Sequence, residues 1–173
     1  MAEPKSVFLV GPMGSGKTAV GRVLARLLHL EFVDSDAEIE HRTGVDIAYI
    51  FEREGEEGFR EREREVIEDL TRRPNIVLST GGGAILRADN RHHLASRGVV
   101  VYLDTSLDQQ AERTRHGRHR PLLNNVDPRQ RLAELMQIRE PLYREVAQVI
   151  VATDGRRPQA VAEDIERQVR PLR

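Results

Sequence analysis

The sequence predicts one α/β domain, in which a mostly parallel sheet of five strands lies between two layers of helices. Short apolar runs alternate along the chain with longer amphipathic segments, which is the pattern of βαβ units and of a parallel sheet covered on both faces. The length of 173 residues suits a single domain with its own hydrophobic core. Glycines or acids directly follow the first three apolar runs, where open sheets bind their ligands.

Each expected strand is a short apolar run that ends at a glycine or a polar cluster. In chain order, these runs are 6–11, 31–36, 75–80, 98–104 and 148–153. The first helix is expected over 18–30, because its valines and leucines recur at helical spacing. A helical region follows at about 37–70, with breaks near Thr43-Gly44 and Gly55. Later helices are expected from about 107, over 128–147 and over 158–169.

Composition excludes several classes of protein and site. The net charge of −1 and the pI of about 6.6 provide no overall positive field for nucleic acid or an anionic membrane. There is no cysteine, so disulfides and thiolate metal sites are excluded. The first residues lack the apolar stretch of a signal peptide, and no apolar run approaches the ~20 residues of a membrane helix. We therefore expect a cytoplasmic protein, and a monomer is the working expectation.

The stretch GPMGSGKT at 11–18 carries the strongest functional signal. It matches G-x-x-x-x-G-K-[ST], follows an apolar run and opens a helical one. Glycines let the backbone N–H groups point at phosphate oxygens, and the helix N-terminus adds its positive dipole end. We expect Lys17 to bridge the outer phosphates and the Thr18 hydroxyl to ligate Mg²⁺. The alternative is a glycine-rich turn with a chance lysine. The residues expected to bind ATP here are Gly14, Ser15, Gly16, Lys17, Thr18 and Ala19.

Lysine at position 17 is unusual in this chain. Of 27 lysines and arginines, only Lys5 and Lys17 are lysines. Lysine is a slim point charge on a flexible stem, whereas the arginine guanidinium is a wide planar fork. Inside a tight ring of backbone amides, the fork would displace the phosphates. The sequence therefore predicts that position 17 requires lysine.

The signatures of other phosphate-loop proteins are missing from the sequence. Neither N-K-x-D for guanine nor D-x-x-G for the γ-phosphate of a GTPase switch occurs. An ATPase motor would hold its metal with an acid at the end of an apolar strand, and Asp104 ends such a run. Asp104 can also start the next helix, which is the interpretation we favour. Small-molecule kinases remain the class that fits best.

Six segments together resemble a known family. GPMGSGKT, FVDSD, GFREREREVI, STGGGAI, RHRPLL and REPLYREVA, in this order and spacing, resemble shikimate kinase over about 5–169. The resemblance implies a phosphate-loop kinase that transfers the γ-phosphate of ATP to the 3-hydroxyl of shikimate, on the route to chorismate and the aromatic amino acids. It implies Mg²⁺ as the cofactor, and ATP and shikimate as the small-molecule substrates. Within the single domain 1–173, it implies a substrate-binding region at about 34–63.

Two acids follow the second expected strand. Asp34 and Asp36 are two residues apart, which on an extended segment puts both carboxylates on one face. A kinase needs one acid near Mg²⁺ and often another to orient or deprotonate the acceptor hydroxyl. The alternative is structural, because Ser35 and Glu38 form a capping-box pattern. By the resemblance, Asp34 lies toward the metal through water, while Asp36 holds the shikimate hydroxyls and is the candidate base.

The resemblance assigns two arginines to the shikimate carboxylate, for which a planar fork is the right group. Arg60 lies in a run of alternating sign, where favourable and unfavourable charge pairs largely cancel, so the residues alone indicate a solvated side chain. Arg139 would, on the same basis, lie on a helix surface. The glycines after the third strand form either a bare turn or a close approach to the ligand. By the resemblance, shikimate contacts Gly81, Gly82 and Gly83, with Ser79 near metal-bound water.

The second half of the chain supplies the remaining candidates. A basic, glycine-containing segment at about 113–126 is either a lid that closes over the phosphates or a solvated loop that binds nothing. By the resemblance, Arg120 reaches the transferring phosphoryl group and Arg113 stacks on adenine. Arg156 is the expected adenine-side contact, with Arg157 as its alternative.

The catalytic roles are thus expected to fall on Lys17, Asp36 and Arg120. Two rival functions remain at this stage. One is a kinase for another small polyol or sugar acid, such as gluconate. The other is a regulatory module that binds ATP and has lost phosphoryl transfer.

Overall fold

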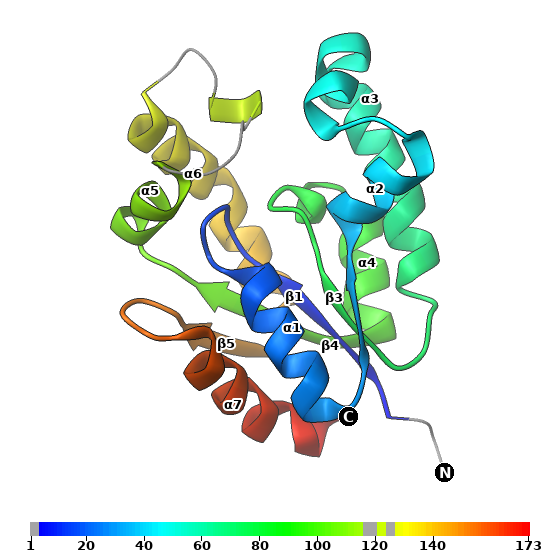
Figure 1. Ribbon diagram of the computed structural model, residues 1–173, viewed down its shortest axis with the longest axis vertical. Coiled ribbons are helices and arrows are strands. Elements are labelled where there is room, and N and C mark those ends of the chain that lie inside the picture. Colours follow the sequence, from blue (N-terminus) through cyan, green and yellow to red (C-terminus); the bar gives the residue numbers. More distant parts are fainter. Residues whose placement is uncertain (1–3, 116–120, 124–126) are drawn as a thin grey trace.

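The computed structural model describes residues 4–115, 121–123 and 127–173 (Figure 1). Its sheet has five strands in the order β2-β3-β1-β4-β5, and every pair is parallel. In the central strand, Val7 lies opposite Val77 on one side and Val99 on the other. The predicted parallel α/β sheet is therefore confirmed. The strands are β1 (Ser6–Val10), β2 (Glu31–Asp34), β3 (Ile76–Ser79), β4 (Gly98–Asp104) and β5 (Val149–Ala152).

Helices cover both faces of this sheet, as expected. On one face lie α1 and α7, and on the other lie α3, α4 and α6 (Figure 1). The α-helices are α1 (Lys17–Leu28), α2 (Ser35–Thr43), α3 (Ile47–Leu70), α4 (Ala88–Arg97), α5 (Leu107–Arg115), α6 (Pro128–Val146) and α7 (Pro158–Val169).

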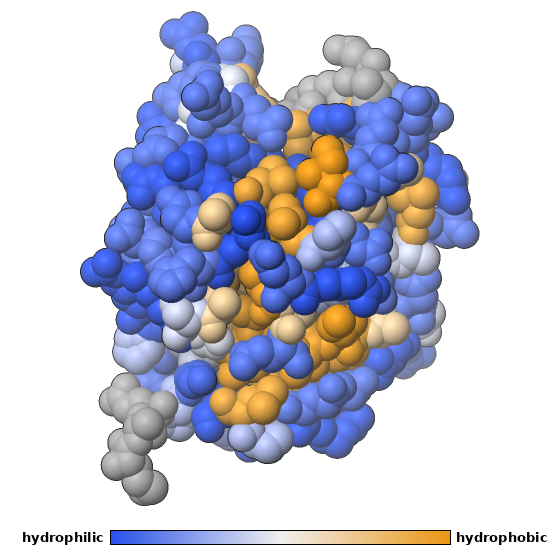
Figure 2. Space-filling view, turned by 180° about the vertical axis from the view of Figure 1, so that it is seen from behind, coloured by the Kyte–Doolittle hydropathy of each residue, from blue (hydrophilic) through white to orange (hydrophobic). Residues whose placement is uncertain are grey.

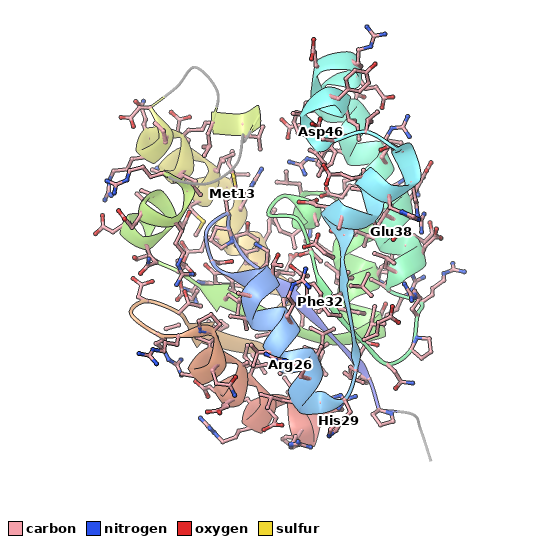
Figure 3. All side chains as sticks on the ribbon, in the orientation of Figure 1. Met13, Arg26, His29, Phe32, Glu38 and Asp46 are labelled. Atoms are coloured by element: carbon pink, nitrogen blue, oxygen red, sulfur yellow. The ribbon has the colours of Figure 1, made fainter. Side chains whose placement is uncertain are left out.

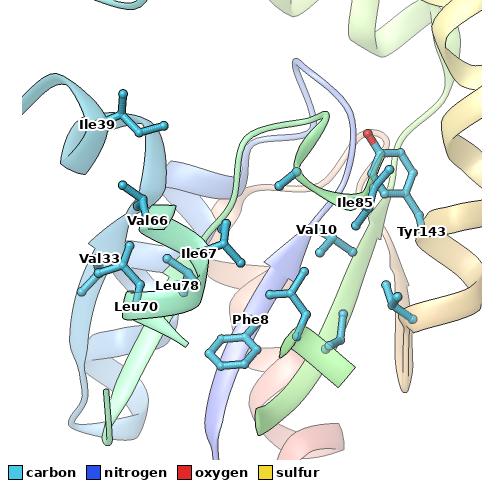
Figure 4. Close-up of a cluster of buried hydrophobic side chains, with 14 of the residues drawn as sticks. Phe8, Val10, Val33, Ile39, Val66, Ile67, Leu70, Leu78, Ile85 and Tyr143 are labelled. Atoms are coloured by element: carbon cyan, nitrogen blue, oxygen red, sulfur yellow. The ribbon is translucent and has the colours of Figure 1, made fainter. Parts of the chain in front are cut away.

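Two apolar cores result from the alternation of side chains along the strands. In β1, Phe8 and Val10 belong to the core under α3, α4 and α6, whereas Val7 and Leu9 belong to the core under α1 and α7. Figure 4 shows part of the first core, where side chains of α2 and α3 meet those of the sheet. Because both sheet faces are buried, the strands read in the sequence as continuous apolar runs.

Glycines end or interrupt the helices where the sequence predicts breaks. Gly44 caps α2 with a φ of 74°, and Gly55 interrupts α3 with a φ of 73° and a ψ of −179°. Both are backbone conformations that favour glycine. The predicted breaks near these residues are therefore confirmed.

The apolar pattern gives no bounds for α4, because only Asn90 and Leu94 are buried in it. One expectation needs correction. Asp104 is the last residue of β4 and does not start the next helix. That helix, α5, begins three residues later at Leu107. The Ser106 hydroxyl, directly before it, accepts a hydrogen bond from the Gln109 N–H at 3.2 Å.

Among the described residues, no helix is long and apolar enough to cross a membrane. Seen from behind, the surface is largely hydrophilic with apolar atoms gathered near the middle (Figure 2). Exposed apolar residues of this kind are common on monomers. The expected monomer and cytoplasmic location stay predictions. The large exposed apolar side chains in the described residues are Tyr49, Ile138, Ile150 and Leu172.

Candidate active site

A cleft of about 750 Å³ lies beyond the carboxyl ends of β1, β2 and β3. The phosphate loop that follows β1 lines one side, and α2 and the start of α3 line the other. Met13 and Asp46 lie on these two sides (Figure 3). The cleft brings together most of the residues expected from the sequence. These are Gly14, Gly16, Lys17, Thr18, Ala19, Asp34, Asp36, Arg60, Ser79, Gly81, Gly82, Gly83, Arg113 and Arg139.

The phosphate loop curls around its lysine. Gly14 and Gly16 have φ values of 76° and 86°, and Gly16 is the N-cap of α1. The Lys17 ammonium donates to the backbone carbonyls of Gly11 at 2.6 Å and Pro12 at 3.0 Å. The loop is also tightly packed, because a Cβ on Gly14 would lie 3.0 Å from a backbone oxygen of α5. The loop therefore presents its backbone and a centrally held ammonium, as an anion site requires.

Asp34 joins the phosphate loop to α2. Its Oδ2 accepts a hydrogen bond from the Thr18 hydroxyl at 3.1 Å, while its Oδ1 accepts from the N–H groups of Asp36 and Ala37. Asp34 is thus the N-cap of α2, and the capping-box interpretation of Ser35 was wrong. The Ser35 hydroxyl instead accepts from the Gly81 N–H at 3.1 Å. One carboxylate therefore caps a helix and leaves an oxygen beside the threonine hydroxyl.

Two buried carboxyl groups meet at the glycine turn after β3. Among the described residues, neither Asp36 Oδ1 nor Glu63 Oε2 has a hydrogen-bond partner. A Cβ on Gly81 would lie 2.8 Å from the first oxygen and 2.9 Å from the second. Burial, followed by the nearby Glu63 and Asp34 charges, raises the pKa of Asp36 to about 7, against the lowering effect of Lys17 and Arg60. Burial also raises the pKa of Glu63.

Arg60 is buried, so the solvated-face interpretation was wrong. Only 9% of the residue is exposed. Its guanidinium donates to the buried Glu63 carboxylate at 2.9 Å and to the half-exposed Glu56 carboxylate at 3.2 Å. It also fills the space in which a Cβ of Gly83 would lie. In contrast, Arg62 of the same run is exposed and pairs with Glu54.

Arg139 is a residue of α6 and also lines the cleft. It is 3% exposed, so its placement on a helix surface was wrong. Burial lowers the pKa of its guanidinium. Its Nη1 would be 3.4 Å from a Cβ on Gly82. The glycine turn 81–83 therefore touches Arg139 at one residue and Arg60 at the next.

The other predicted residues divide into three groups. Arg113 lines the cleft and donates to the Gly14 carbonyl at 3.1 Å. Arg156 and Arg157 are not among the described lining residues, and Arg156 pairs with Asp164 of α7 at 3.2 Å. Arg120 and part of the predicted lid lie outside the described residues.

Sequence reasoning missed two residues that hold the site together. Glu63 lies in the same run of alternating charge as Arg60, and its position three residues after Arg60 is compatible with a pair on one helix face. Tyr143 lies four residues after Arg139, and its hydroxyl donates to the Gly82 carbonyl at 2.5 Å. Helical spacing from each arginine was the available signal for both residues.

Comparisons with known proteins agree on one family. The family model for shikimate kinase matches residues 13–170. A shikimate kinase of Shewanella sp. (strain ANA-3) is 56% identical over 169 residues, which cover 98% of this chain and 99% of that protein. The solved shikimate kinase from Acinetobacter baumannii, in complex with shikimate, is 49% identical with a TM-score of 0.95, covering 98% of this chain and 95% of that one.

A more distant likeness extends to another kinase. The structure of a gluconokinase from Sinorhizobium meliloti has a TM-score of 0.65 and is 20% identical, covering 99% of this chain and 95% of that one. At this identity the likeness concerns the fold alone. It does not favour gluconate as an acceptor.

Proposed function

The chain belongs to the shikimate kinase family, and from this premise we propose how its cleft divides between two substrates. The activity is the transfer of the γ-phosphoryl group of ATP to the 3-hydroxyl of shikimate, giving 3-phosphoshikimate and ADP. One observation carries the division: a single cleft is lined by the phosphate loop at one end and by two buried arginines at the other. Donor and acceptor then meet between them.

The ATP half comprises the phosphate loop and Arg113. Backbone N–H groups of 14–19 and the Lys17 ammonium bind the phosphates, and Arg113 contacts adenine. Arg156 and Arg120 complete this half, at the adenine and at the transferring phosphoryl group. Lys17 is already held inside the loop at 2.6 Å from the Gly11 carbonyl, which supports its role as the central cation.

Mg²⁺ is proposed to bind at Thr18 and Asp34. The threonine hydroxyl lies 3.1 Å from the Asp34 carboxylate, so two hard oxygen ligands converge beside the phosphate loop. Mg²⁺ uses one or two carboxylates together with phosphates and water, and these residues fit it. When bound, the ion would neutralise charge on the β- and γ-phosphates.

The shikimate half comprises the two arginines and the glycine turn. Arg60 and Arg139 offer planar forks to the carboxylate. Asp36 holds the acceptor hydroxyl and is a candidate base, because its pKa of about 7 suits proton transfer near neutral pH. Neighbouring side chains already fill the space that a Cβ would need at Gly81 and Gly83, so the turn fits glycine at both positions. Without side chains, the backbone of the turn 81–83 can approach the substrate closely.

Transfer then depends mainly on position and charge. A bond forms between the 3-hydroxyl oxygen and the γ-phosphorus as the bond to the bridging oxygen of ADP breaks. The hydroxyl proton passes to the Asp36 carboxylate. The substrate-binding region at about 34–63 and the lid at about 113–126 remain part of this proposal. The lid would exclude water while the group moves.

A coupled assay of ADP release tests the function against its rivals. Shikimate, gluconate and nucleoside monophosphates are supplied in turn with Mg-ATP. We expect turnover with shikimate only. Turnover with gluconate alone would identify a sugar-acid kinase, and ATP binding without turnover on any acceptor would identify a regulatory module.

A further inference from the structure

Two stacked tyrosines in the buried core differ in what their hydroxyls do. Tyr102 of β4 and Tyr143 of α6 are both fully buried, with ring centroids 5.1 Å apart and planes at 23°. The Tyr143 hydroxyl donates to the Gly82 carbonyl at 2.5 Å. In the part of the chain that the structure describes, the Tyr102 hydroxyl has no hydrogen-bond partner. The two rings therefore share a packing role, and only one has a polar contact with the site.

Arg139 lies beside the same glycine as the Tyr143 hydroxyl, because its Nη1 would be 3.4 Å from a Cβ on Gly82. The two residues are one helical turn apart on α6, so their side chains share a face. Burial raises the pKa of the Tyr143 hydroxyl, and the nearby Arg139 charge opposes this rise. Since the hydroxyl gives its single proton to the Gly82 carbonyl, it can only accept from the guanidinium. Any hydrogen bond between the two side chains therefore runs from Arg139 to Tyr143, because the proton of Tyr143 goes to the Gly82 carbonyl.

Tyr143 links α6 to the glycine turn 81–83 through one hydrogen bond. Gly82 is 61 residues away in the chain, in the turn that touches both arginines. Figure 4 shows the hydroxyl at the edge of the apolar cluster, pointing away from the core. The ring is fixed by its apolar packing, so the hydroxyl has little freedom to follow a moving turn. It is a rigid spacer between Arg139 and the backbone of the turn.

We propose that Tyr143 is a positioning residue for the carboxylate of shikimate. It orients the Arg139 guanidinium and holds the Gly82 carbonyl, so that both sides of the acceptor subsite keep one geometry. The inference rests on the proposed assignment of Arg139 to the carboxylate. Loss of the hydroxyl leaves the packing ring in place and frees both partners, and small displacements of binding groups weaken a site markedly.

The test compares Tyr143→Phe with its matched control, Tyr102→Phe. Each variant removes one hydroxyl from the same stacked pair. We expect Tyr143→Phe to raise the KM for shikimate by about five- to tenfold, the effect of one lost hydrogen bond near a charged group. Its KM for ATP and its kcat should stay within about twofold of the wild type. Tyr102→Phe should match the wild type in all three constants.

A double-mutant cycle with Arg139→Lys separates positioning from general stability. If Tyr143 acts through Arg139, its removal should change the shikimate KM by less than about twofold in the Arg139→Lys background. Equal effects in both backgrounds would overturn the inference, as would a wild-type KM for Tyr143→Phe. If Tyr143→Phe raised the KM for shikimate and the KM for ATP equally and also lowered Tm, the inference would be overturned as well. Such a result would indicate a general structural role of the hydroxyl. Absence of shikimate turnover by the wild type would instead remove the proposed function itself.

Discussion

Replacing Asp36 with asparagine is expected to raise the free energy of unfolding of the ligand-free protein, by an amount that grows with pH. The pKa of Asp36 rises from 3.8 to about 7 on folding, through burial and then the neighbouring Glu63 and Asp34 charges. The folded state therefore binds the proton more tightly than the unfolded state does. Stability then falls as pH rises between these two values. Asparagine has no proton to lose, so the variant escapes this loss.

The magnitude follows from the two pKa values. A difference of about three pH units, at about 1.4 kcal/mol each, sets an upper limit of about 4 kcal/mol above pH 7. Part of the difference is already present at pH 5, because the unfolded carboxyl is largely ionised there. Between pH 5 and pH 8, the advantage of the variant should therefore grow by about 2 to 3 kcal/mol.

Urea unfolding at pH 5, 6, 7 and 8, without nucleotide and with a chelator, measures this difference. Asp89→Asn is the matched control, because Asp89 is an exposed acid in the first turn of α4. A gain in the stability of Asp89→Asn that grows with pH as much as that of Asp36→Asn would show that the trend does not come from Asp36. An Asp36→Asn advantage that is the same at every pH, or a less stable variant, would refute the assigned cause. The same variant should lose shikimate turnover, since it removes the proposed base.

Three further substitutions test other parts of the site. Arg60→Ala should raise the KM for shikimate far more than that for ATP, whereas the exposed Arg62→Ala should leave both near wild type; equal effects of Arg60→Ala on the two substrates would remove its role at the carboxylate. Lys17→Arg should lower kcat at least about a hundredfold in the ADP-release assay, despite unchanged charge, because the loop closes on the ammonium at 2.6 Å; retained turnover would show that the fork fits. Gly81→Ala should lower both Tm and shikimate affinity, because its Cβ would lie within 3 Å of two carboxyl oxygens. Gly82→Ala meets only ordinary contacts, and an equal loss of Tm there would contradict the steric argument.

The fold and the phosphate loop could be predicted from sequence because both depend on local patterns. Buried parallel strands read as apolar runs, and the helices between them show their own period. In the phosphate loop, Gly16, Lys17 and Thr18 are consecutive, so one motif specifies the turn, the cation and the hydroxyl. Gly44 and Gly55 could be placed at breaks for the same reason. These features need no knowledge of distant contacts.

Burial of the charged groups was decided by the tertiary structure. Arg60 lies in a run whose charges cancel, and only the packing of α3 shows that it faces inward with Glu63 while Arg62 faces outward. In the sequence, Arg139 has the pattern of a surface arginine on an amphipathic helix. It is buried because α6 packs beside the glycine turn. Desolvation depends on what covers a side chain, and the covering elements lie far away in the sequence.

By itself, the sequence determined a parallel α/β fold, a phosphate loop that contains Lys17 and, through its motifs, the kinase family. Only the tertiary structure decided that Asp36, Glu63 and Gly81 meet in one buried place, and that Tyr143 joins α6 to the turn after β3. The physical reason is the distance along the chain over which each interaction acts. Hydrogen bonding and periodicity within a segment are written in consecutive residues, whereas the pKa of a carboxyl and the orientation of a guanidinium are set by neighbours brought together on folding.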